Sequence, residues 1–137
     1  VDPDSGLQVA GVRSVDGSKI VAVRDLVRDT TLLDTRTGEN TTIGIVATNT
    51  RLTKTELAIV ARMAHDGLAR AIRPAHTPSD GDTIFAIATG ELTDDVSLLQ
   101  IGALAADATA DAILRGVRAA TGLPGFPSAG DLQGGAP

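Results

Sequence analysis

The residues best suited to chemistry in this chain are a threonine and a pair of aspartates, each placed just before an apolar segment. Thr41 follows Asn40 at the end of a polar, turn-forming run and stands at the head of the apolar segment 43–48. A threonine hydroxyl acts as a nucleophile when a base lies within hydrogen-bond reach, and a free α-amine, with a pKa of about 8, can be that base. Cleavage between Asn40 and Thr41 would create this amine. The alternative is that the two residues form only the exit of a turn.

The aspartates Asp80 and Asp82 are separated by Gly81 and precede the apolar segment 83–89. Gly81 lets the backbone turn, so that both carboxylates could face one site. Two carboxylates this close do not both ionise easily when buried, and one of them could hold a proton at neutral pH and donate a hydrogen bond. The alternatives are a plain Asp-Gly turn and a partial calcium loop. A calcium loop would need further alternating oxygen ligands and a terminal glutamate, which this segment lacks.

Two histidines complete the set of chemically interesting side chains. His65 lies beside Asp66 in a predicted helix, where a structural role or a contact with the following loop is expected. His76 lies in the loop that leads to Asp80 and is the better candidate for a site, with a turn-stabilising hydrogen bond as the alternative. Two separate histidines in a chain without cysteine give no metal signature. We find no Walker, dinucleotide or Gly-x-Ser-x-Gly motif, and we expect neither a metal nor a cofactor.

The elements that must position these residues follow from the apolar periodicity, which predicts strand, helix, strand, helix. The segments 43–48 and 83–89 are apolar on both faces, which is typical of central strands. A capping-box pattern at 53–56 begins an amphipathic helix over 54–72, and a second helix is predicted over about 97–120. Two strands and two helices cannot cover both faces of such a sheet. We therefore expect more sheet and more helix from another part of the polypeptide or from another subunit.

The two ends of the chain differ from this central part. Two short strands are expected at 9–12 and 19–23. The segment 24–40 alternates charged, threonine and leucine residues, and its end, 34–40, has the composition of an exposed, mobile linker. From about residue 121 the chain is rich in glycine and proline, which predicts an irregular tail.

Composition excludes several classes of function. Hydrophobic residues make up 42% of the 137 residues, enough for a core, but that core must be aliphatic because Phe85 and Phe126 are the only aromatic residues. The net charge of −5, without a basic cluster, argues against nucleic-acid binding, as does the lack of aromatic stacking platforms. No apolar run reaches the length of about 18 residues that a membrane span needs. The absence of cysteine and of a visible signal peptide leads us to expect a cytoplasmic protein.

Three blocks, taken together, resemble a known family. They are NTTIGIVAT at 40–48, AHDGLARAI at 64–72 and DGDTIFAIATG at 80–90. Their order and spacing are similar to those of the N-terminal-nucleophile aminopeptidases and amidases, which include the L-aminopeptidase/D-esterases, the β-peptidyl aminopeptidases and the nylon-oligomer hydrolases. The resemblance covers about 41–120. Many members use serine as the nucleophile, and a threonine preceded by asparagine is most similar to the nylon-oligomer hydrolase branch.

The resemblance implies a fold, an activity and a set of roles. The implied fold is an α/β, layered α-β-β-α sandwich, to which this chain contributes only part of the sheets and helices. A precursor would cleave itself between Asn40 and Thr41, and Thr41 would then attack amide substrates and form an acyl-enzyme that water hydrolyses. Asp80 and Asp82 would orient and polarise Thr41. The implied substrates are linear amides of ω-amino acids, such as 6-aminohexanoate oligomers, and the implied assembly is a tetramer of heterodimers.

One part of the family pattern is missing from this chain, and it indicates which portion of the precursor the chain represents. The family also uses a lysine and an asparagine from a larger upstream subunit, and nothing before Asn40 matches them; Lys19 is not an acceptable substitute. We therefore expect residues 1–40 to be the C-terminal remnant of the larger subunit and 41–137 to be the smaller, nucleophile-bearing subunit. Without the upstream part we expect no activity. The alternatives are a β-peptidyl or D-amino-acid aminopeptidase of the same family, and a non-catalytic α/β interaction module.

Overall fold

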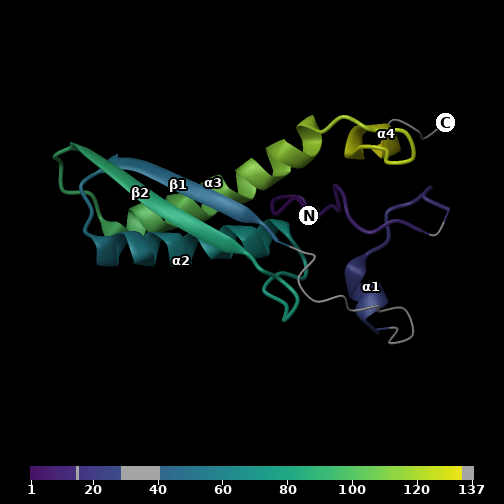
Figure 1. Cartoon of the computed structure of the whole chain (residues 1–137), viewed down its shortest axis with the longest axis horizontal. Helices are drawn as coiled ribbons and strands as arrows, with labels where there is room; N and C mark the ends of the chain where they lie inside the picture. Colours follow the sequence, from purple (N-terminus) through teal and green to yellow (C-terminus); the bar gives the residue numbers. More distant parts are fainter. Residues whose placement is uncertain (15, 29–40, 134–137) are drawn as a thin grey trace.

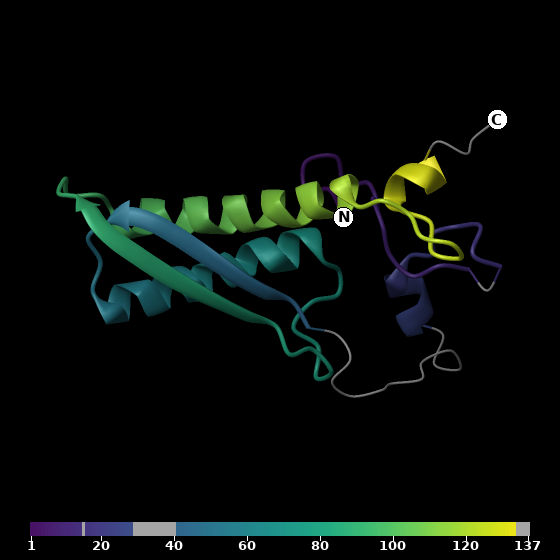
Figure 2. The same ribbon diagram turned by 45° about the horizontal axis from the view of Figure 1, so that its top comes forward.

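A two-stranded parallel sheet, covered on one face by two long helices, forms the centre of the computed structural model, which describes residues 1–14, 16–28 and 41–133 (Figure 1). The elements, in chain order, are α1 (Val23–Arg28), β1 (Ile43–Thr50), α2 (Lys54–Ala71), β2 (Thr83–Leu92), α3 (Leu98–Ala119) and α4 (Ala129–Gln133). The turned view in Figure 2 shows α2 and α3 on the same side of the sheet. The mixed α/β class expected from the sequence is therefore confirmed.

The sheet is a single β-α-β unit. Parallel neighbours need a crossover connection, and α2 supplies it between β1 and β2. The pairing runs from Ile43 opposite Thr83 to Thr48 opposite Ala88, and an irregularity follows before Thr50. Both strands are longer than the sequence indicated. β1 extends two residues beyond the predicted segment, to Thr50, and β2 continues through Gly90, which has a φ of 74°, to Leu92.

The helix α2 begins as its sequence predicts. The side chain of Thr53 accepts a hydrogen bond from the Glu56 amide at 3.3 Å, and the Glu56 carboxylate accepts one from the Thr53 amide at 2.7 Å. These two bonds form a capping box, which satisfies amides that the first turn leaves without partners. The observed bounds of α2 and α3 lie within one residue of the predicted 54–72 and 97–120 at each end.

The core lies between the inner face of the sheet and the two long helices. Its buried side chains come from α2, β2 and α3, and they are Val60, Ala64, Leu68, Ile84, Ile101 and Ala105. Gly67 allows α2 and α3 to approach closely, because a Cβ at this position would lie 1.9 Å from the carbonyl oxygen of Ala106. The contact between the two helices is therefore made close by small residues.

The outer face of the sheet differs from the sequence-based expectation. We expected both strands to be buried on both faces, but within the described residues only one face is covered. The side chains on the other face remain exposed: Ile43 (74%), Ile45 (67%), Phe85 (55%) and Ile87 (48%). An apolar parallel sheet normally has cover on both sides. The additional cover from elsewhere therefore stays a prediction.

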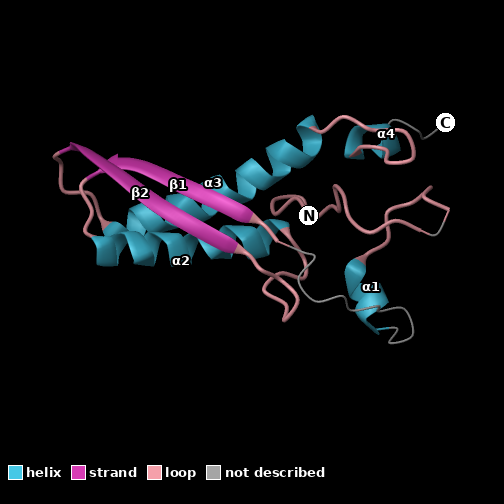
Figure 3. Ribbon diagram, viewed as in Figure 1, coloured by secondary structure: helices cyan, strands magenta, loops and turns pink. Residues whose placement is uncertain are grey.

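The ends of the chain also differ from the expectation. The short strands predicted at 9–12 and 19–23 are absent from the described residues; a single antiparallel bridge joins Arg13 and Ile20, and α1 begins at the end of the second segment. Such short strands have no sheet to join, and an isolated pair is only marginally stable. The tail from about residue 121 is mostly loop but contains α4 (Figure 3).

Two further expectations concern the linker and the membrane spans. The linker predicted at 34–40 lies outside the described residues, and α1 covers the first residues of the segment 24–40 that ends in it. Among the described residues, no helix combines the length and the apolar character needed to cross a membrane.

Candidate active site

The parallel register brings the starts of both strands together. Because Ile43 lies opposite Thr83, residues 41–42 lie beside 81–82, although about forty residues of chain separate them. The Thr83 amide donates a hydrogen bond to the carbonyl oxygen of Thr42 at 2.9 Å, so the pairing begins at this point. The candidate nucleophile and the Asp-Gly-Asp segment therefore meet at one end of the sheet.

Asp82 holds the peptide that follows the candidate nucleophile. Its Oδ1 atom accepts a hydrogen bond from the Thr42 amide at 2.8 Å. A bond from an amide to a carboxylate is stronger than one between neutral groups. The amide that directly follows Thr41 is therefore fixed in direction by a residue at the start of the neighbouring strand.

The hydroxyl of Thr41 lies over Gly81. A Cβ placed on Gly81 would lie 2.6 Å from the Oγ1 atom of Thr41 and 3.7 Å from its Cβ and Cγ2 atoms. The sequence analysis assigned Gly81 to a backbone turn, but its φ lies outside the left-handed region and the structure shows a different need. The absence of a side chain at Gly81 makes room for the hydroxyl, and Thr41 itself is exposed to solvent.

Asp80 has a different set of partners from Asp82. Its Oδ2 atom accepts a hydrogen bond from the Thr77 amide at 2.7 Å, and its own amide donates to the Thr77 carbonyl oxygen at 3.0 Å. These reciprocal bonds close the turn at 77–80, just ahead of β2. Among the described residues, no hydrogen bond joins the carboxylates of Asp80 and Asp82. The sharing of one proton between them therefore stays a prediction.

The two histidines contact each other beside this segment. The Nδ1 atom of His65, on α2, lies 3.2 Å from the Nε2 atom of His76, in the loop before β2, and the ring planes are tilted by 53°. His76 has a φ of 58°, in the left-handed region. The sequence suggested a contact between His65 and the following loop, but nothing in it indicated that His76 would be the partner.

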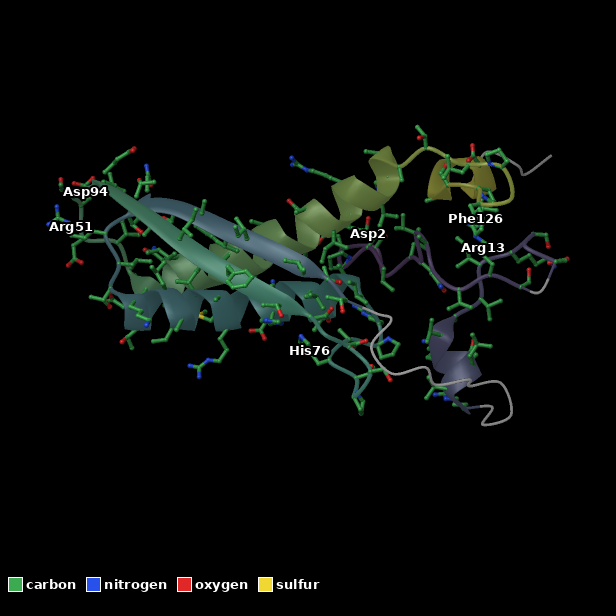
Figure 4. All side chains as sticks on the ribbon, in the orientation of Figure 1. Asp2, Arg13, Arg51, His76, Asp94 and Phe126 are labelled. Carbon is green, nitrogen blue, oxygen red and sulfur yellow. The ribbon has the colours of Figure 1, made fainter. Side chains whose placement is uncertain are left out.

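Figure 4 shows which labelled residues lie near each end of the sheet. His76 lies where β2 begins, whereas Arg51 and Asp94 lie at the opposite end, beyond the last residues of the strands. Asp94 is therefore distant from Thr41, which precedes the start of β1. Asn40, which precedes the predicted cleavage point, lies outside the described residues.

The part of the chain that the structure describes holds no further candidate for the chemistry of this site. It contains no group of three or more histidine, cysteine or acidic side chains that could bind a metal ion. No described lysine or asparagine side chain forms a hydrogen bond with Thr41 or with Asp82.

Comparison with known proteins finds one family model and several relatives that are similar to this chain. Residues 4–129 match the model of peptidase family S58. An uncharacterized aminopeptidase of Mycobacterium tuberculosis is 44% identical over 110 aligned residues, covering 71% of this chain and 32% of the relative. The 6-aminohexanoate-oligomer endohydrolase of Kocuria sp. is 34% identical over 90 residues (58% and 25%), and that of Paenarthrobacter ureafaciens is 36% identical over 86 residues (55% and 24%). The chain spans about a third or less of these curated relatives.

Proposed function

This chain belongs to peptidase family S58, and on that premise we propose that it carries the nucleophile of a self-processing hydrolase that cleaves linear amides. The observation that supports the proposal most directly is the position of Thr41. Its exposed hydroxyl lies over Gly81, and the next amide is held by the carboxylate of Asp82.

The proposed reaction begins with the cleavage of the bond between Asn40 and Thr41. The freed α-amine of Thr41 then accepts the proton of the Thr41 hydroxyl, whose oxygen attacks the carbonyl carbon of the substrate amide. The C–N bond breaks, the protonated base returns its proton to the leaving amine, and the acyl group stays on Thr41 as an ester. Water attacks the ester and releases the acid product, which regenerates the free hydroxyl.

The two aspartates have different proposed roles. Asp82 positions the nucleophile, because it fixes the peptide unit between Thr41 and Thr42. Asp80 closes the turn that presents Gly81 to the hydroxyl. The oxyanion of the tetrahedral intermediate needs preorganised donors, and we propose that they come from a larger upstream subunit, as the family resemblance implies.

We further propose that this larger subunit covers the outer face of the sheet. The four exposed side chains Ile43, Ile45, Phe85 and Ile87 form an apolar surface at which a second sheet could pack. The relatives are about three to four times as long as the region they share with this chain, which leaves ample chain for a second sheet. The same proposal includes a tetramer of heterodimers located in the cytoplasm, which size measurement and cell fractionation would test.

The proposed substrates are linear amides of ω-amino acids, such as 6-aminohexanoate oligomers. Support comes from the relatives named as 6-aminohexanoate-oligomer endohydrolases. A second candidate is an aminopeptidase, because the mycobacterial relative carries that name and is more similar to this chain. Products from a long, defined oligomer separate the two: internal cleavage gives fragments of many lengths, whereas an aminopeptidase releases single residues from the amino end.

The central test is the mass of the purified full-length precursor. Self-processing predicts a break between Asn40 and Thr41, and Thr41→Ala should prevent both the break and the hydrolysis of amide substrates. Thr41→Ser is the matched control, since it keeps a hydroxyl and should retain both. An uncleaved chain after prolonged incubation would favour the non-catalytic interaction module, and hydrolysis by Thr41→Ala would place the nucleophile elsewhere.

A further inference from the structure

The contact between the two histidines connects the outside of α2 to the segment that carries the aspartates. We propose that His65 and His76 are positioning residues, which anchor the loop before β2 to α2 and thereby keep Asp82 on the Thr42 amide. This inference rests on the proposed function, because it assigns the pair a part in holding Thr41.

The contact has the features of a specific connection. It joins two separate elements, and a distance of 3.2 Å between Nδ1 of His65 and Nε2 of His76 fits an N–H···N hydrogen bond, in which the tautomers decide which ring donates. Among the described residues, neither ring has another hydrogen-bond or ion-pair partner. His76 also adopts a φ of 58°, which is unfavourable for a residue with a side chain. Such conformations persist where the surrounding contacts require them.

A short series of bonds leads from this anchor to the nucleophile. Thr77 follows His76 directly, and its backbone is joined to Asp80 by two hydrogen bonds of 2.7 and 3.0 Å. Two residues further along the chain, Asp82 accepts the Thr42 amide at 2.8 Å. The turn at 77–80 therefore acts as a small closed unit with the histidine contact at one end and the start of β2 at the other.

The position of the anchor explains why it would matter. The segment between α2 and β2 has no helix or strand of its own, and the contact of His76 with His65 joins its middle to α2. Ala75, just before His76, also packs against the core, so the histidine contact adds a polar anchor to this apolar one ahead of the closed turn. We therefore expect the bond between Asp82 and the Thr42 amide to open more often when the histidines are separated.

Two substitutions at position 65 separate positioning from general stability. His65→Ala removes the ring, and alanine is the best helix former, so α2 is not weakened. His65→Asn is a poorer helix former but places an amide group near the former Nδ1 position, where it can still bond to His76. If His65 acts only through the stability of α2, the alanine variant should be closer to the wild type. If it acts by positioning the loop, the asparagine variant should be closer.

The experiment measures hydrogen exchange at the Thr42 amide of the purified full-length protein, with its upstream part present, together with kcat and KM on an amide oligomer. For His65→Ala we expect exchange at Thr42 to be roughly three- to tenfold faster, the change expected for the loss of one neutral hydrogen bond, with kcat lowered by a similar factor and KM unchanged. His65→Asn should restore most of both. Arg62→Ala, at an exposed position of the same helix, is the control and should change neither.

The outcomes are separable. Unchanged exchange at Thr42 in His65→Ala overturns the inference, and so does a rise in exchange that is uniform across the core amides. If exchange rises at Thr42 while the full-length wild-type protein hydrolyses no amide, the histidine anchor stands and the proposed function fails.

Discussion

The hydrogen bond between Asp82 and the Thr42 amide gives the most direct test of how the site is positioned. Asp82→Ala removes the acceptor of a 2.8 Å bond to an ionised group. Bonds of this kind contribute about 1.5–3 kcal/mol, which corresponds to a decrease in kcat of about 10-fold to 150-fold if the bond is needed in the transition state. Asp82→Asn can keep a neutral acceptor at the same place, so its loss should be smaller, roughly five- to tenfold.

The assay follows two rates for each variant, because Asp82 could act in both steps. One is the appearance of the break between Asn40 and Thr41, and the other is the hydrolysis of an amide oligomer by protein that is already cleaved. Thr83→Val is a suitable control, since it removes only the bond from the Thr83 hydroxyl to the Gly81 carbonyl oxygen, at 3.2 Å, in the same segment. We expect this control to be close to the wild type.

The measurement would refute the reasoning in either of two ways. Wild-type rates for Asp82→Ala would reduce the Asp-Gly-Asp segment to an ordinary turn. Equal losses for Asp82→Ala and Asp82→Asn would show that the negative charge matters and that the direction given to the amide does not. Thermal unfolding of each variant shows whether a lost rate reflects a lost fold.

Three further predictions concern stability. Gly67→Ala places a Cβ 1.9 Å from the Ala106 carbonyl oxygen, so α2 and α3 must separate, and urea unfolding should show a loss of about 1–3 kcal/mol or more. Gly116→Ala, on the open side of α3, should instead stabilise by about 0.5–1 kcal/mol, and a loss there would contradict this view of the packing. The amide and hydroxyl of Thr53 lower the pKa of Glu56 below 4.5, so this stabilisation is present above that pH and is lost as pH falls through the lower, folded-state pKa. Thermal midpoints should therefore fall more steeply below pH 4.5 for the wild type than for Glu56→Gln, whereas parallel curves would exclude the carboxylate as the cause.

The sequence by itself determined the local elements and their order. The capping box at 53–56, the apolar spacing of the two long helices and the apolar runs that became β1 and β2 each depend on neighbours within a few residues. Such signals are local, and they predicted the strand-helix-strand-helix order with only small errors at the ends. They failed at 9–12 and 19–23, because a short apolar run becomes a strand only when a partner strand is available.

Only the tertiary structure decided which residues meet. The parallel register of β1 and β2 places Thr41 over Gly81 and the Thr42 amide on Asp82, and no spacing in the sequence fixes that register across a crossover helix. The contact of His65 with His76 likewise depends on how the loop folds back along α2. Ile45 is a further example. The sequence shows that its side chain is apolar, but its exposure follows from the packing of α2 and α3 on the opposite face of the sheet.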